Sequence, residues 1–180
     1  DLPLGETSYP MTLAETASIF AETLVRDSIL SECSDDQDKL KILWQNALSG
    51  ATLLINIPAR FEFEKNLVEE RFKRNLTPDQ LKTMMTLAWK KWYGDTLSEY
   101  DSMFWSSKLH FSISGLGFYN YPYLFGYLFS LGLYSLKDSE NFANTYNKVL
   151  RDTGKMTAEE LVSKYLGKNI EENTFWDIGI

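Results

Sequence analysis

The chain has 180 residues, 44% of them hydrophobic, which is enough for one domain with a buried core. Its 18 Lys and Arg face 25 Asp and Glu, and the net charge of −7 argues against a nucleic-acid-binding surface. The single cysteine, Cys33, excludes an internal disulfide, and together with the polar, acidic start of the sequence it indicates a cytoplasmic protein.

Thr12 opens the first predicted helix, which extends to about Ser31 and ends before Ser34-Asp-Asp. Three- and four-residue spacing gives this helix one apolar face, made of Leu13, Ala17, Phe20, Ala21 and Leu24. Residues 36–75 are predicted to form one long helix or two, with a kink at Pro58. The acidic residues in its second half, Glu64 among them, are interpreted with the basic patch 71–74 as a solvated helix face.

The second half of the chain is also predicted to be helical. Thr77 and Pro78 have the residue types of an N-cap and a first helical position, and Gly94 has that of a helix stop. Thr157 begins a capping box. The remaining predicted segments are a helix or turn over 98–107, a glycine-bearing loop or short extended segment over 111–120, and helices over 122–136, 139–151 and 157–166. Because no run alternates strictly as strands do, the sequence predicts a single all-α domain over 1–180.

The stretch between Lys108 and Lys137 holds no charged residue and is long enough to cross a bilayer. Glycines, Pro122 and several tyrosines interrupt it, however, and divide it into a loop and a helix. A buried aromatic helix is therefore predicted rather than a membrane span. A membrane-associated helical protein stays as an alternative.

Glu15 lies in the segment Tyr9–Glu22, with the sequence YPMTLAETASIFAE. From spacing alone, Thr12 and Glu15 form a T-x-x-E capping box, in which the acid only closes the helix N-terminus. Small residues surround the acid, as in a helix that approaches another helix closely: Ala14, Ala17, Ser18 and Ala21. Glu22 follows two turns after Glu15 and shares its face.

His110, the only histidine, begins a second informative segment, HFSISGLGFYNYPYLFGY, which ends at Tyr127. A lone histidine among aromatic residues is typical of a core or interface position with one satisfied hydrogen bond. A row of tyrosines at helical spacing is likewise typical of core packing. Imidazole and phenol groups can nevertheless donate hydrogen bonds to a developing oxyanion, and Gly115 and Gly117 allow the backbone to approach a ligand.

These two segments resemble oligoendopeptidase F, a zinc metallopeptidase of the thimet-oligopeptidase family. The resemblance implies the helical C-terminal half of a zincin-like catalytic domain, with Glu15 as the third zinc ligand and Glu22 as an acceptor that orients a histidine ligand. It also implies a substrate-side wall facing the zinc across the cleft, formed by His110, Tyr121, Tyr123 and Tyr127, with Tyr119 as a further candidate. Three other matching stretches, 59–64, 92–95 and 173–177, are interpreted as structural.

The sequence has no HExxH, which would supply two zinc ligands and the general base of such an enzyme. The resemblance therefore implies a fragment cut after its metal helix, which alone binds zinc poorly and cleaves nothing. With that helix, the expected function is zinc-dependent endopeptidase cleavage of oligopeptides by zinc-activated water. The surface exposed by truncation offers a route to a homodimer. The alternative is a non-enzymatic all-α module whose aromatic groove binds a peptide or a partner helix.

Overall fold

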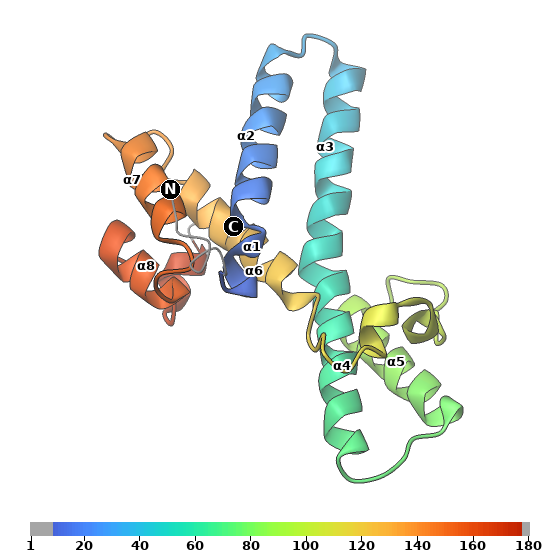
Figure 1. Ribbon diagram of the computed structural model, residues 1–180. Coiled ribbons are helices and arrows are strands. Elements are labelled where there is room, and N and C mark those ends of the chain that lie inside the picture. The colour runs from blue at the N-terminus through green and yellow to red at the C-terminus, as the bar shows by residue number, and fades with distance from the viewer. Residues whose placement is uncertain (1–8, 178–180) are drawn as a thin grey trace. The chain divides into compact units, whose positions relative to one another are not determined.

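The computed structural model describes residues 9–177, and these form helices joined by turns, with no strand among them (Figure 1). The pair Thr153 and Met156 forms an isolated bridge. The all-α prediction is confirmed. The elements in chain order are α1 (Met11–Ala14), α2 (Thr16–Glu32), α3 (Asp36–Ala51), η2 (Thr52–Asn56), α4 (Ile57–Arg71), α5 (Pro78–Tyr93), η3 (Phe104–Ser107), η4 (Leu109–Phe111), α6 (Tyr121–Tyr134), α7 (Phe142–Asp152), α8 (Ala158–Leu166) and α9 (Asn173–Trp176).

The contacts of the chain divide it into two compact units. Unit 1 comprises Asp1–Trp44 and Phe125–Ile180, and unit 2 comprises Gln45–Leu124. The two divisions fall inside α3 and α6, so each of these helices contributes to both units. The single domain stays a prediction.

Unit 1 has a core built from both ends of the chain. Phe129 and Leu133 of α6 are fully buried, as are Leu161 and Val162 of α8. Phe20 of α2 packs against two further aromatic rings, with ring centroids 4.4 Å from Tyr146 and 5.8 Å from Phe142. The closing helix α9 completes this core through Phe175, whose ring centroid lies 5.7 Å from that of Phe129. The packing of Phe175 is compatible with the structural role expected for 173–177, which stays a prediction.

Unit 2 is organised by the packing of α4 against α5 (Figure 1). Phe63 of α4 and Met85 of α5 are fully buried, and Trp89 is nearly so. The indole Nε1 of Trp89 donates to the carbonyl of Asp101 at 3.0 Å, so the segment after α5 is held back against the helix pair. This is the platform on which residues 104–120 lie.

Local chemistry accounts for the most accurately predicted helix ends. The Thr77 hydroxyl accepts from Gln80 N while the Gln80 side chain accepts from Thr77 N, and Thr157 and Glu160 repeat the arrangement at α8. Gly94 and Gly167 follow α5 and α8 at φ 54° and 61°, where a Cβ is unfavourable. The predicted N-cap Thr77, the predicted stop Gly94 and the predicted capping box at Thr157 are confirmed.

Pro58 does not end the long helix, because the chain changes its hydrogen-bonding register just before it. The π-helical segment η2 leads directly into α4, and Pro58 is the second residue of α4, so the wider π-helical turn lies where the proline lacks an N–H. Residues 36–71 are therefore helical throughout, and the predicted kink site is a π-helical insertion.

The apolar face predicted for the first helix is only partly correct. Leu13 and Phe20 are buried with Thr16 between them, whereas Ala17, Ala21 and Leu24 are exposed. The helix is also interrupted at Glu15, so the face of α1 does not continue in simple register into α2. In the part of the chain that the structure describes, no helix combines the length and apolarity needed to span a bilayer.

Candidate functional site

Glu15 occupies the break between α1 and α2, with φ −92° and ψ −2°. The capping-box alternative is wrong: α1 begins at Met11 with Pro10 as its N-cap, and Thr12 lies inside the helix. No side-chain cap forms at Pro10 or at Glu15. The carboxylate accepts a hydrogen bond from Ser18 Oγ at 3.2 Å, and its side chain is half-buried. The acid is therefore not used to start a helix.

The close approach beside Glu15 comes from the glycine of another helix. A Cβ placed on Gly126 of α6 would lie 3.0 Å from Glu15 Cβ and 3.2 Å from its carbonyl carbon. A side chain at this position would require Glu15 to shift, so the glycine lets α6 contact the backbone of Glu15 closely. The prediction that small residues of α2 pack tightly around the acid is wrong, because Ala17, Ser18 and Ala21 are exposed.

Two other predicted residues of unit 1 lie on these same helices. Tyr127 follows Gly126 in α6 and is half-buried. Glu22 lies on α2, where its carboxylate pairs with the guanidinium of Arg26 one turn later. The role of Glu22 in orienting a histidine stays a prediction.

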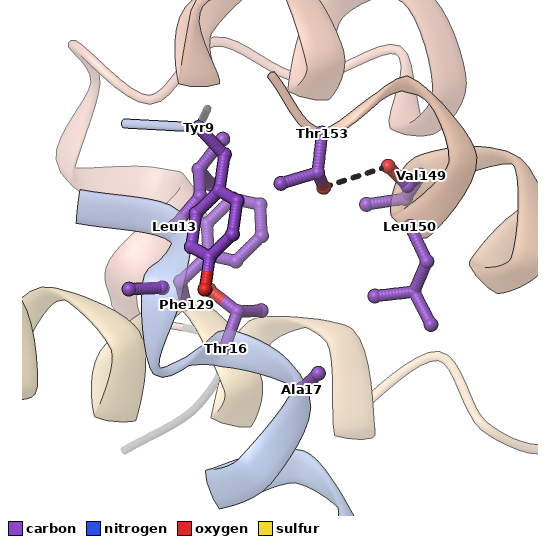
Figure 2. Close-up of a pocket in the computed structure, with 9 residues that line it drawn as sticks. Tyr9, Leu13, Thr16, Ala17, Phe129, Val149, Leu150 and Thr153 are labelled. Atoms are coloured by element: carbon purple, nitrogen blue, oxygen red, sulfur yellow. Dashed lines mark hydrogen bonds between the residues drawn. The ribbon is translucent and has the colours of Figure 1, made fainter. Parts of the chain in front are cut away.

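A pocket of ≈ 330 Å³ lies next to this region in unit 1 (Figure 2). Its walls are mostly apolar, with Leu13 from α1, Phe129 from α6 and Leu150 from α7. Ala14 and Thr16, the neighbours of Glu15 in sequence, also line it, and the buried Thr16 hydroxyl has no hydrogen-bond partner in the described chain. Glu15 itself does not line the pocket.

In unit 2, His110 lies in the short η4 turn and is half-buried. Its Nε2 lies 2.6 Å from the Nδ2 of Asn120, a buried side chain. Burial lowers the pKa of His110 below its ordinary 6.5, and the positive charges of Arg60 and Lys108 lower it further. Both effects favour the neutral imidazole. The hydrogen bond to Asn120 is compatible both with a core or interface histidine and with a histidine that binds substrate.

The candidate tyrosines near His110 do not all lie on the same side: Tyr119 and Tyr123 lie toward His110, and Tyr121 lies against α4. The ring of Tyr119 lies 5.8 Å from that of His110, and its hydroxyl lies 3.1 Å from the hydroxyl of Tyr123. These three side chains form one row of polar aromatic groups. Tyr121 instead packs edge-on against Phe61, at a centroid distance of 6.2 Å. Within unit 2 the structure therefore brings His110 together with Tyr119 and Tyr123, and Tyr121 is not in this row.

Sequence analysis missed two residues of α4 that hold this row in place. Glu64 was interpreted as solvated, but its side chain is 4% exposed and its Oε1 accepts from Phe118 N at 2.6 Å. Burial raises the pKa of this carboxyl. Arg60, one turn earlier, donates to Asn120 Oδ1 at 3.4 Å and lies over the Phe104 ring at 4.9 Å. The signal was their i, i+4 spacing between the aromatic residues of α4.

A pocket of ≈ 380 Å³ adjoins His110 on the side of α4. Apolar groups of Leu67, Val68 and Phe111 line it, and Glu64 and Arg71 are its ionisable members besides the imidazole. A pocket with mostly apolar walls and a few convergent polar groups suits an apolar side chain of a larger ligand.

Within residues 9–177, no three or more His, Cys, Asp or Glu side chains lie close enough to hold a metal ion together. A zinc site needs three protein ligands, and Glu15 offers one carboxylate. Its donor chemistry fits one such position, and the other ligands would have to come from outside these residues.

Comparisons of the chain with protein-family models, with curated proteins and with solved structures find no match in any of the three.

Proposed function

We propose that this chain is part of a zinc-dependent metalloendopeptidase that hydrolyses oligopeptides. In this proposal Glu15 of unit 1 is the third metal ligand. His110 of unit 2, with its neighbouring tyrosines, binds the reacting part of the substrate. Residues outside this sequence would supply the HExxH helix, and the 180-residue chain alone is expected to be inactive.

The observation that carries the proposal is the state of the Glu15 carboxylate. Among the described residues, its side chain caps no helix and accepts from the Ser18 hydroxyl, while its backbone lies against Gly126. A carboxylate with lone pairs to spare on a fixed backbone is what a metal ligand requires. Glu15 also lies in a segment that resembles the ligand segment of oligoendopeptidase F, and this resemblance supports the interpretation of its carboxylate as a metal ligand.

Bound zinc would polarise the scissile carbonyl and lower the pKa of a water molecule. In this proposal, the role of the residues around His110 is to bind and orient the substrate. The row of His110, Tyr119 and Tyr123 presents N–H and O–H groups that can donate to a carbonyl oxygen as its negative charge grows. The adjoining pocket would take an apolar side chain of the peptide.

The experiment is to express the natural reading frame that contains this sequence, with and without Glu15→Gln. We expect one zinc per chain and chelator-sensitive cleavage of a fluorogenic oligopeptide. Because loss of an outer partner of a metal ligand already costs 10–100-fold, loss of the ligand itself should lower kcat/KM by more than about 100-fold and release zinc.

Glu32→Gln is the matched control, since Glu32 is exposed at the far end of α2, the helix that follows Glu15, and its replacement should change neither zinc content nor activity. A reading frame without HExxH, or a Glu15→Gln protein that keeps full zinc and activity, would overturn the proposal.

A second candidate, the interaction module, is favoured by the exposed apolar residues of α3. Leu40, Trp44 and Leu48 recur every four residues and are 66%, 61% and 45% exposed. Such a stripe is typical of a helix face that meets a partner. Sedimentation of the 180-residue chain tests this: a dimer that Trp44→Glu dissociates would support it, and a monomer at high concentration would argue against self-association.

A further inference from the structure

His110 is linked to α4 through one buried amide. We propose that Arg60 and Asn120 are positioning residues that hold the His110 imidazole in a single neutral tautomer, with its proton on Nδ1 and its lone pair on Nε2. The significance of this tautomer for catalysis rests on the proposed function. The tautomer itself is a property of the chain and can be measured without any activity.

The first step is the orientation of the Asn120 amide. A guanidinium only donates hydrogen bonds, so the Asn120 oxygen must face Arg60 Nη1, 3.4 Å away. The amide NH₂ then faces His110 Nε2 at 2.6 Å. The reverse orientation would set NH₂ against the guanidinium, two donors facing each other in a place where Asn120 is 4% exposed.

The second step is the state of the ring. An amide NH₂ donates and cannot accept, so the ring nitrogen that it meets must carry a lone pair. In a neutral imidazole the proton is then on Nδ1. Protonation of the ring would direct an Nε2–H at the amide NH₂ and break the hydrogen bond.

The third step is that α4 prevents Asn120 from moving away. Glu64, one turn after Arg60, accepts from Phe118 N at 2.6 Å, and Phe118 holds a left-handed φ of 56°. The ring of Phe61 lies 5.4 Å from that of Phe118. Asn120 also accepts at its backbone carbonyl from Tyr123 N at 3.2 Å. The segment 118–120 is thus fixed from both sides.

The surrounding charges favour the same neutral state. Arg60 and Lys108 are positive, and each lowers the pKa of His110. Among the described residues that line the pocket beside the ring, Glu64 carries the carboxyl group, and burial raises its pKa, so it does less to stabilise a charged imidazole. Among the described residues, the charged or titratable groups around His110 include Arg60, Glu64 and Arg71 on α4, Lys108 and Tyr119 on the segment that carries the ring, and Tyr123 at the start of α6.

The consequence is a division of roles between the two ring nitrogens. Nε2 is occupied by the amide, and Nδ1–H is the hydrogen-bond donor that remains for a ligand. His110 would therefore act as an uncharged donor to a substrate oxygen, and it would not be a general base through Nε2.

The test uses the fact that His110 is the only histidine in the chain. Long-range ¹H–¹⁵N NMR of the ¹⁵N-labelled 180-residue chain then reports one imidazole, and its tautomer is read directly. We expect the Nδ1–H form to exceed the Nε2–H form by about tenfold or more, because the alternative faces two buried donors against each other. The midpoint of the pH titration should lie below that of a free histidine.

Three variants test the hydrogen bonds that connect Arg60, Asn120 and His110. Asn120→Asp replaces the donor with an acceptor, so the proton should move to Nε2 and the pKa of His110 should rise. Arg60→Gln frees the amide and should reduce the Nδ1–H excess. Lys108→Met removes a charge and leaves the hydrogen bond, so the pKa should rise while the tautomer is unchanged.

Asn75→Asp on the exposed surface is the matched control and should alter neither quantity. Circular dichroism and the dispersion of the amide spectrum establish that each variant is folded. An Nε2–H tautomer in the unmodified chain, or an unchanged tautomer in both Asn120→Asp and Arg60→Gln, would overturn the inference. A correct tautomer combined with an inactive or zinc-free full protein would refute the proposed function alone.

Discussion

The surroundings of Glu15 in unit 1 and of His110 in unit 2 differ in what they fix. At Glu15 the backbone is fixed by contact with Gly126, while the carboxylate has a serine hydroxyl as its partner. At His110 the side chain itself is fixed, through Asn120, by a charged residue of α4. Unit 1 therefore fixes the backbone of Glu15 and leaves its carboxylate available, whereas unit 2 fixes the orientation of the His110 side chain.

This difference fits two kinds of chemistry. A metal ligand has to keep its lone pairs for an ion that arrives from outside, so few partners within the chain are an advantage. A group that binds a developing charge works best when its donor is oriented before the substrate arrives. The predictions below test whether the two units differ as described, from the largest expected effect to the smallest.

The largest expected effects come from the two cores. Phe63→Ala in unit 2 and Phe129→Ala in unit 1 should each lower the free energy of unfolding by about 3–5 kcal/mol, because both side chains are fully buried. Phe72→Ala, at a position 88% exposed, should change it by less than about 0.5 kcal/mol. Urea denaturation measures all three.

Hydrogen exchange on the same variants tests the independence of the units. Phe63→Ala should lower protection mainly in α4 and α5, and Phe129→Ala mainly in α6 and α8. Equal loss of protection throughout the chain in both variants would mean that the two units unfold together as one cooperative domain.

A smaller effect is expected where α6 contacts Glu15. Gly126→Val should destabilise the chain by about 1–3 kcal/mol, since even its Cβ would lie 3.0 Å from Glu15 Cβ and 3.2 Å from backbone. Gly115→Val is the control, because nothing lies within 4 Å of a Cβ there. Thermal unfolding compares the two, and an equal loss at both positions would show that the contact with Glu15 is not close.

The smallest effects are pH-dependent and should have opposite signs in the two units. Burial raises the pKa of Glu64, so its ionisation disfavours the folded state and stability falls as pH rises from about 4.5 through the raised pKa. Hydrogen bonds from Tyr165 and Lys164 lower the pKa of Asp152 to about 2. Its contribution is therefore present above pH 3.8 and is lost as pH falls toward 2.

Difference profiles against Glu64→Gln and Asp152→Asn isolate the two groups. Subtracting the variant from the parent should give a curve that declines with rising pH for Glu64 and one that increases with rising pH for Asp152. Chemical denaturation at a series of pH values supplies both curves. Two curves of the same sign would mean that one of the two carboxyl environments is wrongly described.

The predictability of the fold follows the range of the interactions involved. Thr77, Gly94 and Thr157 act on backbone groups within four residues of themselves, so the ends that they set are visible in the sequence. The π-helical insertion before Pro58 was foreseen only as a kink, because the geometry that absorbs a proline depends on the packing of the helix on both sides.

For the candidate site, the residue types could be predicted from the sequence, but the contacts between these residues could not. His110 and its tyrosines were selected through the resemblance to oligoendopeptidase F, and their ability to donate hydrogen bonds is compatible with that selection. The grouping of His110 with Tyr119 and Tyr123, and the exclusion of Tyr121, depend on where the loop ends and α6 begins. Glu64 was misjudged because a charge on an amphipathic helix is usually solvated, and only a contact 54 residues away buries it.

By itself, the sequence determined the all-helical class, most helix ends and the chemical types of the candidate residues, since these follow from spacing and local hydrogen bonding. Tertiary structure alone decided that Glu15 is no helix cap, that Gly126 fixes its backbone and that Arg60 and Glu64 hold the His110 segment. The last two depend on contacts between segments distant in sequence, and periodicity within a single helix carries no information about which distant segment will cover it.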